Sequence, residues 1–416
     1  MRIVFLCILA LLASVARAET NAVFDVRTFG ATGDGKTKDT AAFQKALDAC
    51  AAANGGIVNV TAGVYLVGSI IIGSNTTLHL DGRASLLGSP DAEDYPVVRV
   101  RWEGEYAQGH RALISAANAD HIAINGRGYI FGPPITLGRL RNPRGPALIE
   151  LAECKDVTLE GFTTQYEQLW SIHPVLCQKL VASNLTIRSV ASNGDGIDVD
   201  SCQDVLIEHC SIDTGDDAIA LKSGRGLAAV HLARPTQDVV IKDCSLVSSI
   251  FAGVAIGSEL SGGIRNIHVE NCLIKGRQNG ISFKSRDGRG GSIENFTGEN
   301  LLIDHSPTFI DINLLNKGIQ ASDPVTNATD KWTSMRNIHF THIRVINVTD
   351  LVRATNIPPE RPVDGLTLTD IKGTCTHGLT LANMTNVVFS EINVTGYEVP
   401  LVTSTNVHGT GLEEKQ

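Results

Sequence analysis

Two neighbouring carboxylates, Asp216 and Asp217, stand between a glycine and a run of small apolar residues in the string TGDDAIALKSG. A third, Asp195, lies earlier in the chain, in NGDGIDVD. Like charges that crowd together raise the pKa of one member and leave the others ionised, so such a cluster can supply a general acid and a general base. Cleavage of a glycosidic bond needs that combination. Solvated turn residues or a calcium site are the alternative interpretations of the same acids.

Short strings that alternate apolar and polar residues recur along the chain, and each is about as long as a strand. Neighbouring strings are commonly separated by a little over twenty residues, for example from Val157 to Leu180 (23) and from Leu180 to Val205 (25). Strands repeated at this period, with no helical patterns between them, are typical of a parallel β-helix, in which each coil stacks on the last. A sandwich would need hairpin turns, and signals for those are scarce. We therefore predict an all-β fold.

One helix is predicted, over DTAAFQKALDACAAANGG from Asp39 to Gly56, because apolar residues recur at helical spacing between a capping residue and a terminal glycine pair. A helix at the start of a β-helix would cover its open end and hide strand edges that could pair with another chain. No linker or break in composition follows. Residues 19–416 are therefore predicted to form one domain, a parallel β-helix with an amino-terminal capping helix.

Residues 1–18 predict a secretory signal peptide, since Arg2 precedes an apolar stretch and Ala16-Arg17-Ala18 supplies a small-residue cleavage site. We expect a secreted or periplasmic protein with no membrane attachment after cleavage, because no later segment is apolar over a comparable length. The net charge of −9 implies no basic face, which argues against nucleic acid as a partner. A monomer is expected.

Eight cysteines remain once Cys7 leaves with the signal peptide, and an even number in an oxidising compartment suggests disulfides. However, Cys210, Cys244 and Cys272 occupy the same place in three similar strings, VLIEHCSI, VVIKDCSL and IHVENCLI, where a small buried residue fits. We predict a stacked core role for these three. Zinc-binding Cys-x-x-Cys spacing is absent, and no metal or other cofactor is predicted.

The repeat places the acids relative to one another. If one coil is about 21 to 25 residues long, Asp195 lies one coil before Asp216, and His173 lies one coil before Asp195. His173, Asp195 and the Asp216/Asp217 pair would then share one lateral face, which favours a reaction site over a structural device. Nearby Trp170 fits either a core position or a platform for a sugar.

At these residues the chain resembles glycoside hydrolase family 28, the polygalacturonase family, and its bacterial members in particular. NGDGIDVD and TGDDAIALKSG are similar to the family's Asn-Thr-Asp-Gly and Gly-Asp-Asp motifs, and WSIHP and IGSELSGGIRNI extend the similarity over most of the mature chain. The resemblance implies a right-handed parallel β-helix that hydrolyses pectic polysaccharide with inversion and without a metal. It also implies that Asp216 is the general acid, that Asp195 and Asp217 activate the attacking water, and that Asn193 opens the first motif.

Two positions depart from the family pattern. Phe251 stands where members carry a His that supports the acid, and Ser282 stands where they carry an Arg that grips the substrate carboxylate. Serine cannot replace the bidentate, charged guanidinium. The resemblance therefore leaves polygalacturonan, rhamnogalacturonan and other branched pectic chains open as substrates.

An acidic protein that binds a polyanion needs a local basic cleft, and several Lys and Arg residues lie in the loops around the motifs. Solvated surface charge is the usual alternative for such residues, and we prefer it for Arg289. The predicted substrate-binding residues are Asn193, His173, Lys222, Lys284, Arg225 and Arg286.

We therefore predict a pectic glycosidase. A calcium-dependent pectate lyase on a similar fold and a non-catalytic pectin-binding β-helix remain as alternatives, the second suggested by Phe251 and Ser282. Motifs do not distinguish cleavage within the polymer from cleavage at its end.

Overall fold

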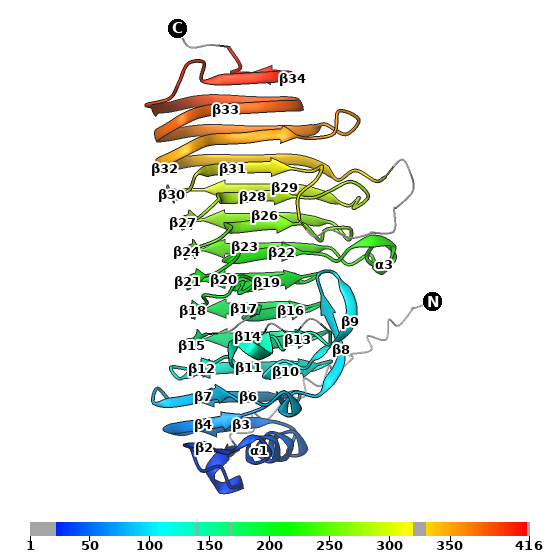
Figure 1. Ribbon diagram of the computed structural model, residues 1–416, viewed down its shortest axis with the longest axis vertical. Helices are drawn as coiled ribbons and strands as arrows, with labels where there is room; N and C mark the ends of the chain where they lie inside the picture. The colour runs from blue at the N-terminus through cyan, green and yellow to red at the C-terminus, as the bar shows by residue number, and fades with distance from the viewer. Residues whose placement is uncertain (1–21, 139, 141, 167–168, 319–329, 414–416) are drawn as a thin grey trace, which may run out of the picture.

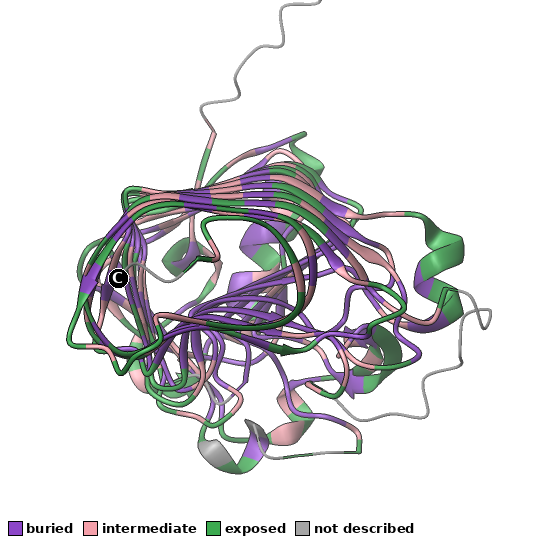
Figure 2. Ribbon diagram, turned by 90° about the horizontal axis from the view of Figure 1, so that it is seen from above, coloured by how far each residue is buried: buried purple, intermediate pink, exposed green. Residues whose placement is uncertain are grey.

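The computed structural model describes residues 22–138, 140, 142–166, 169–318 and 330–413. Its strands wind as parallel coils stacked along one axis, which is a right-handed parallel β-helix (Figure 1). Seen along that axis, the coils superpose on one another (Figure 2). The predicted all-β class and β-helix architecture are confirmed. The predicted signal peptide, residues 1–18, lies outside the described residues.

Each coil contributes one strand to each of three faces, and the strands of a face pair in parallel. Face 1 consists of β1 (Val23–Asp25), β3 (Gly56–Val60), β6 (Thr76–Leu80), β11 (Asp120–Gly126), β14 (Lys155–Glu160), β17 (Gln178–Ser183), β20 (Gln203–Glu208), β23 (Thr236–Lys242), β26 (Ile264–Glu270) and β29 (Ser292–Glu299). Face 2 consists of β2 (Asp34–Lys38), β4 (Gly63–Val67), β7 (Ala84–Gly88), β12 (Tyr129–Phe131), β15 (Thr163–Gln165), β18 (Thr186–Arg188), β21 (Ser211–Thr214), β24 (Ser245–Ser248), β27 (Leu273–Gly276) and β30 (Leu302–Asp304).

Face 3 carries the candidate site. It consists of β5 (Ile70–Ile71), β10 (Ile114–Ala117), β13 (Ile149–Ala152), β16 (Ile172–Val175), β19 (Ile197–Asp200), β22 (Ile219–Lys222), β25 (Ala252–Gly257), β28 (Asn279–Lys284) and β31 (Thr308–Asn313). Long strands then run through successive faces to complete the stack, as β32 (Ser334–Asn356), β33 (Val363–Thr395) and β34 (Val402–Thr410).

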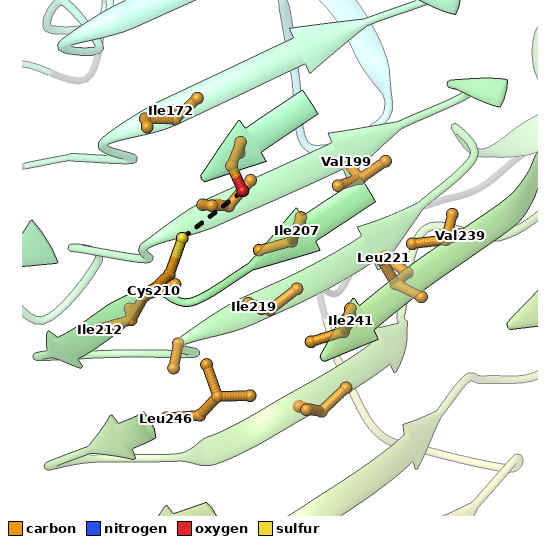
Figure 3. Packing of buried hydrophobic residues seen from close by; sticks show 14 of the residues in the cluster. Ile172, Val199, Ile207, Cys210, Ile212, Ile219, Leu221, Val239, Ile241 and Leu246 are labelled. Atoms are coloured by element: carbon orange, nitrogen blue, oxygen red, sulfur yellow. Dashed lines mark hydrogen bonds between the residues drawn. The ribbon is translucent and has the colours of Figure 1, made fainter. Parts of the chain in front are cut away.

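The core is a column of apolar side chains inside the coils. Val157 pairs with Leu180 and Leu180 with Val205, so the spacings of 23 and 25 predicted from the sequence are the coil register. Alternate residues of each strand point inward, as expected for a pleated strand, and Figure 3 shows them packing from coil to coil. Burial of this column is the main favourable contribution to stability.

The backbone conformation at the corner between faces 1 and 2 explains why Cys210, Cys244 and Cys272 recur at the same position of successive coils. The residues before them, His209, Asp243 and Asn271, each adopt a left-handed backbone conformation with φ of 54°. That turn directs the following cysteines into the core, as predicted, and the Sγ of Cys210 donates to the carbonyl oxygen of Ala182 at 3.6 Å (Figure 3). All eight described cysteines are buried and free, so the structure contains none of the disulfides that their even number suggested.

The predicted capping helix is present as α1 (Thr40–Ala52), which lies across the amino-terminal end of the stack (Figure 1). It ends before the predicted Gly56, because Gly55 and Gly56 have φ of 121° and 145° and lead into β3. Phe43 is fully buried and its ring meets that of Tyr65 edge-on at a centroid distance of 5.3 Å. Shorter helical segments are η1 (Val26–Phe29), η2 (Ala92–Asp94), α2 (Ile135–Gly138) and α3 (Gly226–Leu232).

One antiparallel hairpin, which the sequence did not predict, interrupts the parallel stack. Its strands are β8 (Val97–Trp102) and β9 (Glu105–His110), and it runs alongside the ends of the face 3 strands towards α3 (Figure 1). In the part of the chain that is described, no helix is long and apolar enough to cross a membrane.

The capping helix yields the first prediction. Phe43→Ala should lower the local stability of the amino-terminal coils by about 3–5 kcal/mol, because it leaves a cavity between α1 and the first coil. Hydrogen exchange should quicken in β1, β3 and β4. Lys45→Ala, an exposed position on the same helix, is the control. Equal exchange in the two variants would contradict a capping role for α1.

Candidate active site

The three predicted catalytic aspartates lie where the chain enters face 3. Asp195 precedes β19, and Asp216 and Asp217 precede β22. The amide of Gly196 donates to the carbonyl oxygen of Asp217 at 3.0 Å, so Asp195 is in register with Asp217 and not with Asp216. The structure brings the three acids together, with the column shifted by one position from the sequence prediction.

Glycines allow the coils to approach closely at these turns. A Cβ atom on Gly215 would lie 1.9 Å from the carbonyl oxygen of Ala191, and one on Gly196 would lie 2.3 Å from that of Ala218. Any side chain at either position would push the coils apart. The glycines next to the aspartates therefore keep the carboxylates of successive coils within one site.

These residues surround an open cavity of about 120 Å³. A larger groove of about 600 Å³ lies on the outer surface of face 1, but the aspartates do not line it. Predicted residues in the wall of the smaller cavity are Asn193, Asp195, Asp216, Asp217, Lys222 and Lys284. The wall also contains Glu103, Trp170, Ser258, Glu259 and Gly318, of which only Trp170 was considered from the sequence.

His173 was predicted to bind substrate, and the structure contradicts this. Its side chain is 0% exposed, with Nδ1 3.3 Å from Oε2 of Glu150 and its ring edge-on to Trp170 at 4.7 Å. Ile172 pairs with Ile197, so His173 is in register with Asp198 and not with Asp195. The prediction assumed a shorter coil at this point, and the longer turn displaced the histidine from the column.

Two predicted arginines stand outside the cavity wall. Arg225 forms an ion pair with Glu105 of the hairpin, and Arg286 donates from Nη1 to the carbonyl oxygen of Gly318 at 3.4 Å. The expectation that Arg289 is a solvated surface charge is wrong. It is 0% exposed and donates to the carbonyl oxygen of Ser258.

Two lysines bring positive charge among the acids. Nζ of Lys284 lies 2.7 Å from Oδ2 of Asp217. Nζ of Lys222 lies 3.4 Å from Oδ1 of Asp198 and 3.7 Å from Oε1 of Glu259. Burial lowers the pKa of Lys222, but the negative charges of Glu259 and Asp198 outweigh burial and raise it overall, so Lys222 stays protonated.

Burial and mutual repulsion raise the pKa values of three carboxyl groups at the site. Burial, together with the charge of Asp217, raises the pKa of Asp216 to about 7. Burial raises the pKa of Asp198 to about 6 against the attraction of Lys222. Burial and the charges of Asp198 and Asp216 raise the pKa of Asp195 well above its usual value. The group therefore holds at least one proton near neutral pH, and the acids titrate together.

Glu259 behaves differently although it is also buried. Burial raises its pKa, but the charges of Lys222 and Arg289 outweigh that effect and lower the pKa to about 2. An ionised Glu259 fixes Lys222 beside the aspartates. The pairing of Glu259 with Lys222 was not predicted from the sequence, because Glu259 lies in the string IGSE, outside the aspartate motifs.

Phe251 occupies the position beside Asp216 in the next coil. Its ring packs on Ala220, Ala252 and Ala255 on the outer surface of face 3. The ammonium groups of Lys284 and Lys317 lie 4.4 Å and 4.8 Å from the ring centroid, within the range of cation–π attraction. Phe251 thus places cations on the Asp216 side of the cavity.

Ser282 is fully buried, and its Oγ has no hydrogen-bond partner among the described residues. It supplies no positive charge to the site. Within the same described part of the chain, no group of three or more His, Cys, Asp and Glu side chains is arranged to hold a metal ion.

Comparison with protein families gives two matches. Glycosyl hydrolases family 28 matches residues 58–410. A second family, described as rhamnogalacturonase A/epimerase, pectate lyase-like, matches residues 23–92.

Two curated relatives match over part of their length. It is 34% identical over 283 residues to a probable polygalacturonase of Vitis vinifera, covering 64% of this chain and 57% of that protein. It is 27% identical over 324 residues to the exo-poly-alpha-D-galacturonosidase of Dickeya chrysanthemi, covering 65% and 53%. The aligned part thus spans little more than half the length of these relatives.

Solved structures share the fold over nearly the whole chain. The exopolygalacturonase of Thermotoga maritima gives a TM-score of 0.75 at 24% identity, covering 95% of this chain and 94% of that one. The family 28 exopolygalacturonase of Yersinia enterocolitica gives 0.82 at 21% identity, covering 93% and 78%.

The raised pKa of Asp216 gives a prediction about stability. The folded state holds this proton up to pH of about 7, whereas an ordinary aspartate loses it near 3.8, so Asp216 makes the free energy of unfolding fall as pH rises between these values. Asp216→Asn removes this decrease in the free energy of unfolding, because asparagine does not titrate. Its melting temperature should rise relative to the wild type as pH increases through this window.

Asp213→Asn, which changes an exposed carboxylate in the same coil, is the control and should show no such trend. A difference between Asp216→Asn and wild type that is independent of pH would contradict a raised pKa for Asp216.

Proposed function

Because this chain belongs to glycosyl hydrolases family 28, we propose that it is a secreted or periplasmic, monomeric hydrolase that cleaves pectic polysaccharide by single displacement with inversion. The observation that carries the proposal is the cavity in which Asp195, Asp216 and Asp217 meet. It contains a carboxylic acid that keeps its proton near neutral pH beside a carboxylate paired with an ammonium group. Those are the two groups that hydrolysis of a glycosidic bond requires.

Asp216 is the general acid in this mechanism. It is the least buried of the three aspartates, and its pKa of about 7 lets it donate a proton to the glycosidic oxygen at neutral pH. The bond between that oxygen and the anomeric carbon breaks as the proton transfers. The sugar beyond the oxygen leaves towards Phe251.

Asp217 accepts the proton of the attacking water. Its Oδ2 lies 2.7 Å from Nζ of Lys284, which fixes the position of the carboxylate in the cavity. The water oxygen forms the new bond to the anomeric carbon while Asp217 takes its proton, so one proton is given by Asp216 and one is gained by Asp217. Direct displacement by water inverts the configuration.

Asp195 orients the water in this proposal. Burial and the charges of Asp198 and Asp216 favour the protonated form of Asp195, which can donate a hydrogen bond. The family resemblance assigns Asp195 and Asp217 jointly to the water. The contacts around them distinguish the two, since Lys284 donates a hydrogen bond to Asp217.

The basic side chains support an acidic polymer as substrate. Lys222 and Lys284 both line the cavity. Ser282 supplies no charge there, so the contact to a uronate carboxylate falls to lysine, without the bidentate geometry of arginine. Asn193 completes the polar wall beside Asp195.

Activity is tested by release of reducing ends from polygalacturonan and rhamnogalacturonan with a chelator present. The wild type should be active, and Asp216→Asn should lose about 100- to 10,000-fold in kcat, because the leaving oxygen is no longer protonated. Asp213→Asn should retain activity. Unsaturated products that disappear with chelator would show a lyase instead, and saturable binding without cleavage would show a non-catalytic protein.

The pH profile tests the assignment of the acid. The value of kcat/KM should fall on the alkaline side with an apparent pKa near the value of about 7 expected for Asp216, because only its protonated form donates. A rate that stays constant well above that pH would rule out Asp216 as the proton donor.

A further inference from the structure

The hairpin formed by β8 and β9 is fixed firmly against face 3. Nε of Arg101 donates to Oδ2 of Asp200 at 2.7 Å, and Nη2 of Arg101 donates to Oγ of Ser201 at 3.2 Å. Arg101 is 4% exposed and Asp200 1%, so the ion pair is shielded from water. Separating the partners would leave an uncompensated buried charge, which holds the hairpin in place.

The tip of the hairpin is also anchored. The amide of Arg225 donates to the carbonyl oxygen of Gly104 at 3.2 Å, and the Arg225 side chain pairs with Glu105. A Cβ atom on Gly104 would lie 2.9 Å from the Arg225 nitrogen, so the close approach requires glycine. The hairpin therefore spans from its origin after β7 to the loop that follows β22.

Aromatic side chains fill the space between the hairpin and face 3. The rings of Trp102 and Trp170 are 4.1 Å apart, and the guanidinium group of Arg144 lies over Trp102. Trp170 is 3% exposed and His173 behind it is 0% exposed. The outer surface of β16 is thus covered, and the cavity stops at Trp170 on its amino-terminal side.

The turn of the hairpin carries an unusual residue. Glu103 and Gly104 form a two-residue loop with φ of 49° and 82°, the conformation in which Asn-Gly or Asp-Gly is strongly preferred. Glutamate at a left-handed position costs energy. The side chain of Glu103 lines the cavity. At this end of the site, Glu103 therefore occupies a position that favours Asn or Asp.

The direction of the bound polymer follows from the proposed acid. Phe251 lies beside the proposed acid Asp216 in the next coil, so in this mechanism the leaving sugar lies towards Phe251 and the sugar attacked by water lies towards Asp195 and Trp170. That sugar is on the non-reducing side of the broken bond. Trp170, Asp195 and Asp217 are in register over three successive coils, which gives about 10 Å, enough for one sugar ring.

We propose that the β8–β9 hairpin closes the cleft beyond a single sugar, so that the enzyme removes one sugar at a time from the non-reducing end of the polymer. Glu103 accepts hydrogen bonds from hydroxyl groups of that terminal sugar. The inference rests on the proposed function. Beyond the proposed function, it specifies the bond of the polymer that is cut and the residue that recognises the chain end.

The test uses the wild-type protein and oligogalacturonates or rhamnogalacturonan oligomers labelled at the reducing end. Each labelled oligomer should shorten by one sugar per step, with the monosaccharide as product and little early loss of polymer viscosity. Oligogalacturonates whose non-reducing unit is 4,5-unsaturated lack the hydroxyl at that end. They should be cleaved at least about 10-fold more slowly, as expected when a hydrogen bond to a charged group is lost.

The outcomes separate this inference from the proposed function. Internal fragments, or equal cleavage of unsaturated and saturated oligomers, would overturn the closed end while leaving hydrolysis established. No release of reducing ends from any oligomer would overturn the hydrolase itself, and the inference with it.

A variant tests Glu103 directly. Glu103→Gln should lower kcat/KM on saturated oligomers roughly 10- to 100-fold, because it removes the charge that strengthens the hydrogen bonds. The decrease in kcat/KM caused by Glu103→Gln should be much smaller on unsaturated oligomers. Glu153→Gln changes an exposed glutamate that also has a left-handed backbone, with φ of 54°, and should match the wild type. Equal activity of Glu103→Gln and wild type would overturn the role of Glu103.

Discussion

Repulsion among buried carboxylates is the interaction around which the site is built. Asp195, Asp198 and Asp217 would separate in a flexible loop, since ionised acids in a dry environment repel one another strongly. Here each belongs to a coil whose backbone is hydrogen bonded to the coils above and below. The many backbone hydrogen bonds of the long parallel sheet offset the repulsion between the crowded acids. The resulting raised pKa values of Asp195, Asp198 and Asp216 are what make a carboxyl group useful as an acid near neutral pH.

The cations at the site are divided between two tasks. Lys222 is 4% exposed and lies between Glu259 and Asp198, where it balances their negative charges. Lys284 is near the surface of the cavity, where it contacts both Asp217 and the ring of Phe251. The buried Arg289 supports Glu259 in turn. Lys222 is thus held between buried acids, whereas Lys284 lies between Asp217 and the ring of Phe251.

The sequence predicted the parts of the molecule that repeat. Coil spacing at Val157, Leu180 and Val205 gave the register correctly, since stacked coils must present apolar residues at matching positions. The convergence of the aspartates followed from the same spacing. His173 was misplaced because turns between strands vary in length, and a small error in the length of one turn moves a side chain from the site into the interior.

The hairpin could not be foreseen from the repeat because it interrupts it. Its first string, VVRVRW, alternates over part of its length but EYAQGH does not, and Glu103-Gly104 between them is a weak signal for a two-residue turn. Where the hairpin docks depends on Arg101 meeting Asp200, 99 residues away. The burial of Arg289 likewise depends on a distant carbonyl group, that of Ser258, so its residue type alone suggested a surface position.

The free, buried cysteines bear on how the molecule is made. Because all eight described thiols are unpaired, packing and hydrogen bonding alone join one coil to the next, and no step of folding requires an oxidant. Folding is then indifferent to the redox state of the compartment in which it occurs. The chain can therefore reach the same structure in a reducing medium as in an oxidising one.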